Sequence, residues 1–153
     1  MDGTALVKLR SYHPSDLETL AAIDRVCFPP GIAYSREEIE GFIAQPNSET
    51  WVAVEGEQVI GFVIADRDEK EAGHVMTIDV VEGWRGQGVG AKLMGAAERW
   101  AEDQGLKVMY LETAEDNLGA QGFYQARGYK KLDKINDYYA NGAAAWVMVK
   151  DLK

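Results

Sequence analysis

Three glycines at alternate positions, Gly86, Gly88 and Gly90, stand between an apolar run over residues 74–81 and a helix-compatible run over residues 89–104. Glycine has no side chain and tolerates positive φ, so the backbone can bend around a ligand with its N–H groups pointing inward. Those groups meet the N-terminus of the next helix, where roughly half a positive charge resides. The loop therefore suits a phosphate or pyrophosphate, although a tight strand-to-helix connection without a ligand has the same glycine content.

The spacing of the loop excludes two nucleotide-binding motifs. A Walker loop needs Gly-Lys-Ser/Thr, whereas Gly90 is followed by Ala91-Lys92-Leu93. The dinucleotide fingerprint needs G-x-G-x-x-G, whereas the order here is G-x-G-x-G. The pattern that fits is Arg/Gln-x-x-Gly-x-Gly/Ala, with Arg85, Gly88 and Gly90 at its fixed positions.

The elements that must position this loop alternate between strands and helices. We expect strands over residues 4–10, 51–55, 58–66, 74–81, 107–113, 129–138 and 144–149, with a solvated turn at 67–71. We expect helices over residues 15–28, 35–44, 89–104 and 117–127, the first two opened by the capping boxes Ser15–Glu18 and Ser35–Glu38. Hairpins around Gly56 and residues 140–142 exclude a purely parallel doubly wound sheet. The order predicts a mixed sheet in a three-layer α/β fold.

The composition indicates one globular domain over residues 1–153 and excludes several classes of partner. The net charge of -9 argues against general nucleic-acid binding. No run reaches the ~18 apolar residues of a membrane span, and the N-terminal residues lack a secretory signal pattern. A single cysteine cannot form an internal disulfide, which fits a reducing cytoplasm. We therefore expect a cytoplasmic protein with no nucleic-acid or membrane partner.

The residue types that bind metals are sparse. Cys27 falls on the apolar side of an expected helix, which favours a buried structural thiol over a nucleophile. His13 and His74 are distant from Cys27 in the sequence and show no metal-ligand spacing, so we expect no metal site.

Two motifs carry a family resemblance that covers nearly the whole chain. The Arg85–Gly90 pattern resembles the pyrophosphate loop of the GNAT superfamily of acyl-CoA-dependent N-acetyltransferases. A second motif, Leu-Glu-Val-x-x-x-Asn…Leu-Tyr-x-x-x-Gly-Phe, is typical of the RimI-type protein N-terminal acetyltransferases. The chain resembles this motif at Leu111, Glu112, Asn117, Tyr124, Gly128 and Tyr129. Cys27-Phe28-Pro29 and residues 136–139 also resemble RimI-type positions.

The resemblance implies a mixed, mostly antiparallel sheet flanked by helices, with acetyl-CoA as co-substrate. It implies that a strand segment splays from its neighbour and pairs with the pantetheine arm, which Asn117 would also contact. The segment is Ile78, Asp79 and Val80. It further implies that the pyrophosphate lies on the loop formed by Arg85, Gly86, Gln87, Gly88, Val89, Gly90 and Ala91.

The resemblance also implies that Glu112 is the general base and Tyr124 the general acid. An attacking amine must be neutral, so a carboxylate that takes its proton assists the reaction, and a phenol can protonate the leaving thiolate. The alternatives are structural: a solvated Glu112, a packed Tyr124 ring and an Asn117 that only caps a helix. His74 is a rival base acting through water, since its unperturbed pKa near 6.5 suits the task, or it only ends a strand.

The chain departs from RimI-type patterns at three places. Gly86 stands where a second basic residue is common, Ala114 where a basic residue is common, and residues 143–146 lack an expected acidic residue. The last change concerns the hairpin that helps to select the acceptor. It therefore puts a ribosomal-peptide substrate in doubt more than the reaction.

The sequence favours acetyl transfer from acetyl-CoA to a primary amine by direct attack in a ternary complex, with a protein N-terminal α-amine as the acceptor. Tyr138 and Tyr139, with the loop over residues 28–34, would form the acceptor slot, or they are aromatics that pack on the sheet. One alternative is a small-molecule amine acetyltransferase for a polyamine, amino acid or aminoglycoside, and the other is a non-catalytic acyl-CoA-binding module. Either a monomer or a homodimer is compatible with the sequence.

Overall fold

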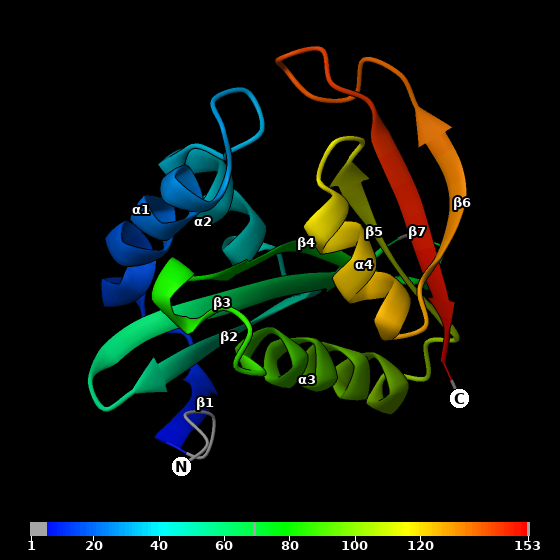
Figure 1. The fold of residues 1–153 in the computed structure, drawn as a ribbon. Helices are drawn as coiled ribbons and strands as arrows, with labels where there is room; N and C mark the ends of the chain where they lie inside the picture. Colours follow the sequence, from blue (N-terminus) through cyan, green and yellow to red (C-terminus); the bar gives the residue numbers. More distant parts are fainter. Residues whose placement is uncertain (1–5, 69, 153) are drawn as a thin grey trace.

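The structure, a computed structural model, describes residues 6–68 and 70–152. Its elements follow the expected order of strands and helices (Figure 1). They are β1 (Val7–Ser11), a 3₁₀ turn (Pro14–Asp16), α1 (Leu17–Cys27), α2 (Arg36–Ala44), β2 (Ser48–Glu55), β3 (Gln58–Arg67), β4 (Gly73–Val80), a 3₁₀ turn (Glu82–Trp84), α3 (Val89–Asp103), β5 (Val108–Ala114), α4 (Leu118–Ala126), β6 (Lys130–Ile135) and β7 (Ala145–Asp151). Residues 4 and 5 of the first expected strand lie outside the described residues.

The described residues form one sheet of seven strands in the order β1-β2-β3-β4-β5-β7-β6. Every neighbouring pair is antiparallel except β4 and β5, which are parallel. Phe62 and Ile64 of β3 pack under α1 and α2, whereas Val63 and Ala65 of the same strand pack under α3. Alternate residues of β3 therefore pack in two different hydrophobic cores. Figure 1 shows the helices that cover the two faces of the sheet. The mixed, mostly antiparallel three-layer fold is confirmed.

The two expected capping boxes have different outcomes. The Ser35 box is confirmed, because Ser35 Oγ accepts from the Glu38 N–H at 3.0 Å and the Glu38 carboxylate accepts from the Ser35 N–H at 2.9 Å. The Ser15 box is wrong, since α1 begins at Leu17 with Asp16 at its N-cap. Asp16 accepts from the His13 N–H at 2.9 Å and from the Arg10 guanidinium at 2.8 and 2.9 Å. The Asp16 carboxylate is thus held by a charge-assisted pair with Arg10, and its side chain makes no capping hydrogen bond to α1.

Strand ends depart from expectation where a partner strand decides them. β2 begins at Ser48, three residues before the expected start, because Ser48 pairs with Asp66. Arg67, expected in a turn, ends β3 and pairs with Gly73. The sixth strand is shorter than expected, since it ends at Ile135, and Asp137 takes a positive φ of 53°.

The feature that makes room for a site is the separation of β4 from β5. The two strands pair only at Gly73 with Met109 and at His74 with Tyr110. Next to this point Met76 is an extra residue, because Ile64 pairs with Thr77 and Ala65 with Val75. Such a bulge bends a strand and reverses which side chains face which layer. The expected splaying of Ile78, Asp79 and Val80 from the next strand is therefore observed.

None of the described helices is long and apolar enough to cross a membrane.

Candidate functional site

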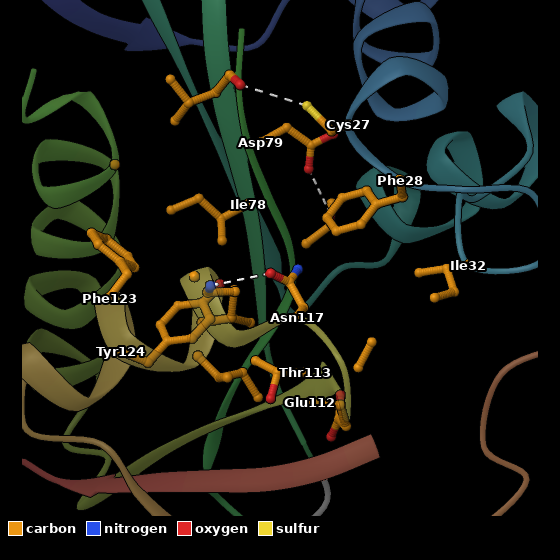
Figure 2. Close-up of a pocket in the computed structure, with 18 of the residues that line it drawn as sticks. Cys27, Phe28, Ile32, Ile78, Asp79, Glu112, Thr113, Asn117, Phe123 and Tyr124 are labelled. Carbon is orange, nitrogen blue, oxygen red and sulfur yellow. Dashed lines mark hydrogen bonds between the residues drawn. The ribbon is translucent and has the colours of Figure 1, made fainter. Parts of the chain in front are cut away.

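A cavity of about 920 Å³ opens where β4 and β5 part (Figure 2). Its walls come from the end of α1, the loop over residues 28–34, β4, the glycine loop (residues 85–91), β5, α4 and the loop at residues 138–139. Most residues that the sequence predicts for the site line this cavity: Ile78, Asp79, Val80, Arg85, Gly86, Gly88, Gly90, Ala91, Glu112, Asn117 and Tyr124. Gln87 and Val89 do not line it. The Gln87 side chain is exposed and donates to the Gly83 carbonyl at 3.1 Å. Val89 is the first residue of α3, and its side chain is buried in the hydrophobic core between this helix and the sheet.

The glycine loop presents backbone donors at one end of the cavity. Gly86 and Gly88 have φ of 76° and 85°, and Gly88 is the N-cap of α3. The Lys92 N–H bonds to the Gly88 carbonyl at 3.1 Å, so the N–H groups of residues 89–91 precede the first helical bond. A Cβ at Gly90 would lie 3.2 Å from the Phe123 ring, which shows how closely α4 approaches the loop. These donors at a helix N-terminus fit a pyrophosphate.

Two side chains complete this end of the cavity. The Arg85 guanidinium folds back over the end of β4, where Nε donates to the Val80 carbonyl at 3.0 Å and Nη2 lies 3.4 Å from Cys27 Sγ. Asn117 Oδ1 accepts from the Ala120 N–H at 3.1 Å and caps α4, as the sequence predicts (Figure 2). Because its oxygen is engaged, the amide N–H₂ group of Asn117 is the part left to face a ligand.

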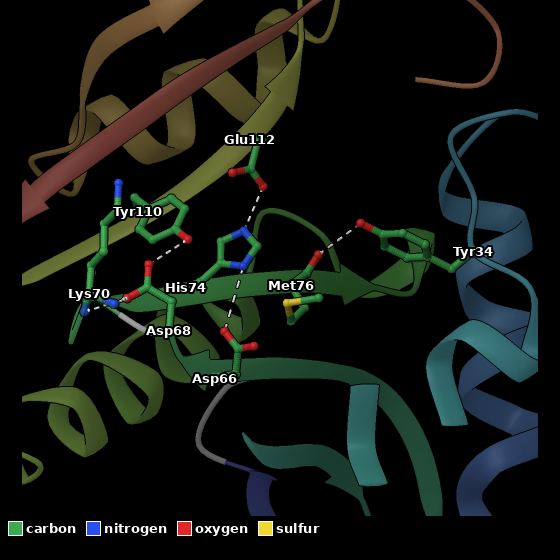
Figure 3. A network of polar contacts seen from close by, with 9 residues as sticks. Tyr34, Asp66, Asp68, Lys70, His74, Met76, Tyr110 and Glu112 are labelled. Carbon is green, nitrogen blue, oxygen red and sulfur yellow. Dashed lines mark hydrogen bonds and ion pairs between the residues drawn. The ribbon is translucent and has the colours of Figure 1, made fainter. Parts of the chain in front are cut away.

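Glu112 and His74, alternatives in the sequence, are in direct contact. His74 Nε2 lies 2.7 Å from Glu112 Oε1, and His74 Nδ1 lies 3.7 Å from Asp66 Oδ1 (Figure 3). The imidazole stacks on the Tyr110 ring at 4.5 Å, and the Tyr110 hydroxyl donates to Asp68 Oδ2 at 3.0 Å. The two candidate bases therefore belong to one polar network.

Tyrosine side chains surround the cavity side of Glu112. Burial, with the charge and a hydrogen bond of Glu112, raises the pKa of Tyr138 to about 12. Burial also raises the pKa of Tyr34 and of Tyr139, and the charge of Glu112 adds to both shifts. The Tyr34 hydroxyl lies 3.5 Å from the carbonyl of the bulge residue Met76. All three phenols therefore stay protonated beside the carboxylate at neutral pH.

The two loops expected to form an acceptor slot meet over this part of the cavity. The Ala140 N–H donates to the Gly31 carbonyl at 3.1 Å, and a Cβ at Gly31 would lie 2.7 Å from Asn141 Cβ. Phe28, Pro29, Ile32, Tyr34, Tyr138 and Tyr139 line the cavity from these loops. The juxtaposition matches the expectation, and it creates an aromatic and apolar entrance.

Tyr124 reaches the cavity from α4 and is 7% exposed. Its ring packs edge-on against Phe123 at 5.2 Å and Tyr129 at 5.8 Å. Burial, with the charge of Asp79, raises the pKa of Tyr124, so its hydroxyl keeps its proton. Glu112 and Tyr124 thus line one cavity from β5 and α4 (Figure 2).

A buried carboxyl pair was not predicted. Asp79 and Asp24 are 2% and 0% exposed, and the Thr77 hydroxyl donates to Asp79 Oδ1 at 2.7 Å. Asp24 Oδ2 accepts from the Tyr34 N–H at 2.7 Å, so the pair ties α1, the 28–34 loop and β4 together. Burial and the neighbouring Asp24 raise the pKa of Asp79. An acidic residue within an apolar strand was the signal available in the sequence.

Cys27 is half-buried rather than part of the core, because it ends α1 at the wall of the cavity. Its thiol lies 3.6 Å from the Val80 carbonyl. Burial raises the pKa of Cys27, so the thiol is protonated and a poor nucleophile. Among the described residues, no group of three or more His, Cys, Asp or Glu side chains is arranged to hold a metal ion.

Known proteins resemble this chain in sequence and in fold. N-alpha-acetyltransferase 30 of Schizosaccharomyces pombe is 30% identical over 117 residues, which cover 74% of this chain and 78% of that protein. Ard1 from Thermoplasma volcanium has the same fold, with a TM-score of 0.89 and 22% identity over 97% of this chain and 99% of that chain. The ribosomal-protein-S18-alanine N-acetyltransferase from Escherichia coli gives a TM-score of 0.84 at 17% identity, over 96% of this chain and 94% of that chain.

Residues 17–129 match the family model described as the Acetyltransferase (GNAT) family. The match spans β4, the glycine loop, Glu112 and α4, which together build most of the cavity. This chain therefore belongs to the GNAT acetyltransferase family and is an acetyl-CoA-dependent N-acetyltransferase.

Proposed function

We propose that this protein acetylates the N-terminal α-amine of a protein. The observation that carries the proposal is the position of Glu112, whose carboxylate faces the slot between the 28–34 loop and the tyrosines at 138 and 139. A chain end can enter such a slot with its amine toward the carboxylate. The relative from Schizosaccharomyces pombe is named as an N-alpha-acetyltransferase, which supports this acceptor class. A RimI-type specificity remains a prediction, because the Escherichia coli enzyme is similar in fold alone.

In this proposal acetyl-CoA occupies the cavity between β4 and β5. The glycine loop holds its pyrophosphate through backbone N–H groups, those of Gly86, Gln87 and Val89 included. The Arg85 guanidinium adds a positive charge to the same site. The edge of β4 at residues 78–80 pairs with the pantetheine arm, and Asn117 donates to the same arm. The Asp79 side chain is buried and accepts from the Thr77 hydroxyl, so in this proposal Asp79 contacts the arm through its backbone.

Glu112 and Tyr124 divide the proton transfers. An α-amine has a reference pKa near 8, so at neutral pH most of it must lose a proton before it attacks. Glu112 takes that proton, the amine nitrogen bonds to the thioester carbon, and the C–S bond breaks. The protonated hydroxyl of Tyr124 then supplies a proton to the leaving thiolate and regains one from the acylated nitrogen, which leaves a neutral amide. The transfer is direct in this proposal, and burial raises the pKa of the Cys27 thiol, which makes Cys27 a poor nucleophile for an acyl-enzyme.

A second candidate acceptor is a small polyamine. The net charge of -9 favours a polycation, and the carboxylate at the slot would accept any amine. A non-catalytic acyl-CoA-binding module has less support, since it would need neither Glu112 nor Tyr124 in the cavity. A single domain over residues 1–153, a cytoplasmic location and a monomer or homodimer remain predictions.

The test is thiol release from acetyl-CoA by the wild type and by Glu112→Gln. The acceptor panel contains peptides with free N-termini, peptides with blocked N-termini and a lysine, polyamines and amino acids. We expect turnover only with free N-termini, reduced about 10²-fold or more in Glu112→Gln. Turnover with polyamines alone would support a small-molecule acceptor. Undiminished turnover by Glu112→Gln would exclude Glu112 as the general base.

A further inference from the structure

We propose that Asp66 is a positioning residue that orients His74, so that the imidazole carries the proton of Glu112 to solvent beside the β3–β4 turn. The inference rests on the proposed role of Glu112 as base and extends it to two residues outside the cavity. Neither Asp66 nor His74 lines the cavity.

The strand pairing fixes the geometry of the three groups. Asp66 of β3 is the direct partner of His74 of β4, so the two side chains stand on one face of the sheet. His74 of β4 is also the parallel partner of Tyr110 of β5, two residues before Glu112. The imidazole therefore lies between the carboxylates of two different strands, with Asp66 on one side and Glu112 on the other (Figure 3).

Asp66 carries an unusual buried atom. Its Oδ1 is buried and has no hydrogen-bond partner among the described residues, and it faces His74 Nδ1 at 3.7 Å. A buried carboxylate oxygen without a hydrogen-bond partner is costly, and a cation on the facing imidazole would offset that cost. A distance of 3.7 Å is long for a neutral hydrogen bond and within ion-pair range. At this distance Asp66 acts on the imidazole through its charge rather than through a hydrogen bond, and that charge favours a proton on Nδ1.

The reaction requires an exit for one proton. An acceptor ammonium loses two protons as its nitrogen bonds to the acetyl carbon and the C–S bond breaks. One proton ends on the sulfur of coenzyme A by way of Tyr124, and the other remains on Glu112. An acceptor in the slot covers the cavity side of Glu112, whereas His74 contacts the carboxylate at 2.7 Å from the opposite side. The side chains of His74 and Asp66 are 17% and 16% exposed, so the proton can leave from them to water.

Asp66 selects the tautomer that this transfer needs. Only an imidazole with its proton on Nδ1 presents a lone pair on Nε2 to the protonated Glu112, and the Asp66 carboxylate favours a proton on Nδ1. The Tyr110 ring stacks on the imidazole, and Asp68 holds the Tyr110 hydroxyl in place. These contacts prevent the ring from turning away between turnovers.

The charged groups around His74 are mostly acidic. Asp66 faces it from β3, Glu112 and Tyr110 from β5, Asp68 stands behind Tyr110 after β3, and Lys70 lies on the same turn (Figure 3). Tyr138 reaches the far side of Glu112 from the loop before β7. Removing the negative charge of Asp66 therefore makes an imidazolium less favourable, because Asp66 is the anion that faces Nδ1.

The test compares Asp66→Asn with Asp103→Asn, a matched control that removes an exposed carboxylate at the end of α3. For Asp66→Asn we expect kcat to fall about tenfold, with the dissociation constant for acetyl-CoA unchanged. We also expect the acidic limb of kcat/KM against pH to change, since burial raises the pKa of Asp66 and this carboxyl must be ionised to act on His74. Asp103→Asn should keep the wild-type profile.

His74→Ala provides an independent readout, because imidazole added to the buffer can replace the lost ring. We expect a lower kcat that rises with imidazole concentration, whereas imidazole should not affect Asp103→Asn. Wild-type kcat and pH profile in Asp66→Asn, or no imidazole rescue in a folded His74→Ala, would overturn the relay. Full turnover by Glu112→Gln would instead overturn the proposed base, so the two failures are distinguishable.

Discussion

Tyr124 offers a clean test at the scale of one residue, because Tyr124→Phe removes only the hydroxyl. The ring contacts with Phe123 and Tyr129 would remain, so we expect acetyl-CoA to bind with its wild-type dissociation constant. Turnover should fall about 10²-fold, since the leaving thiolate loses its proton donor. Tyr129→Phe is the matched control. Its hydroxyl donates to Glu98 at 2.8 Å, so it should lower the melting temperature but keep turnover. Equal turnover of Tyr124→Phe and wild type would exclude Tyr124 as the acid.

Asp79 predicts a pH dependence of stability. Burial and Asp24 raise its pKa in the folded protein, so the folded state retains a proton that the unfolded chain, near pKa 3.9, has lost. The stability from this group is present below the unfolded pKa and is lost as pH rises through the folded pKa. In the variant Asp79→Asn, the side-chain amide does not titrate, and its N–H₂ group can donate to the Asp24 carboxylate. The melting temperature of Asp79→Asn, relative to wild type, should therefore rise between about pH 5 and pH 8. A constant or falling difference would contradict the raised pKa.

The chemistry of single residues was predictable from the sequence only in part. Glu112, Asn117 and Tyr124 could be named because they stand at fixed spacings in one motif. The contact between Glu112 and His74 could not be predicted, because it depends on the parallel pairing of two strands that are separated by α3. The Asp24–Asp79 pair was missed for the same reason, since α1 and β4 are distant in the sequence.

At the scale of elements, the contact between the two slot loops can be separated from the rest of the fold. Gly31 has a φ of 88°, and a Cβ there would lie 2.7 Å from Asn141 Cβ and 2.9 Å from its backbone nitrogen. Gly31→Ala should therefore push the 28–34 loop away from the loop before β7. We expect KM for the acceptor peptide to rise several-fold, while the dissociation constant for acetyl-CoA stays the same, because the glycine loop is untouched.

Gly56→Ala is the matched control for this change. Gly56 also has a positive φ, of 60°, but nothing lies within 4 Å of a Cβ built there. The two substitutions share backbone strain of about 1 kcal/mol, so a comparison isolates the effect of the loop contact. A peptide KM that rises equally in both variants would mean that strain, and not the slot, is responsible.

Elements were predictable where their signals are local. The Ser35 box marks the start of α2 because both of its hydrogen bonds lie within four residues. Strand ends are set by partners instead: β7 reaches Asp151 because Val108 of β5 pairs with it, and apolar alternation carries no information on that pairing. The same holds for Asp16, whose carboxylate is drawn to Arg10 of β1 and displaces the expected cap.

At the scale of the whole molecule, the three-layer architecture follows from periodicity that is visible in the sequence. β3 alternates its side chains between two cores, and the helices that cover them have apolar faces at helical spacing. The cavity follows from something less visible, the bulge at Met76 and the separation of β4 from β5. The bulge was not predicted, because the residues around Met76 have ordinary strand propensity.

The net charge of -9 predicts opposite salt effects on the two substrates. Acetyl-CoA is anionic, so the field of the whole protein opposes its approach, whereas the glycine loop and Arg85 attract it locally. A basic peptide is attracted by the same field. The Debye length is about 10 Å at 0.1 M salt, so raising ionic strength from about 0.02 to 0.3 M screens both long-range effects. Acetyl-CoA should therefore associate faster at high salt, because the repulsion is screened. The basic peptide should bind less well, with a higher KM, because its attraction to the protein is screened.

Stopped-flow fluorescence of the tryptophans can follow acetyl-CoA association, and steady-state thiol release gives the peptide KM. An uncharged peptide serves as the control, since its KM should change little with salt. Acetyl-CoA association that slows with salt would mean that the local field of the glycine loop exceeds the repulsion from the remaining surface. In that case Arg85→Gln should abolish the slowing, because Arg85 is the charged side chain of that loop that lines the cavity.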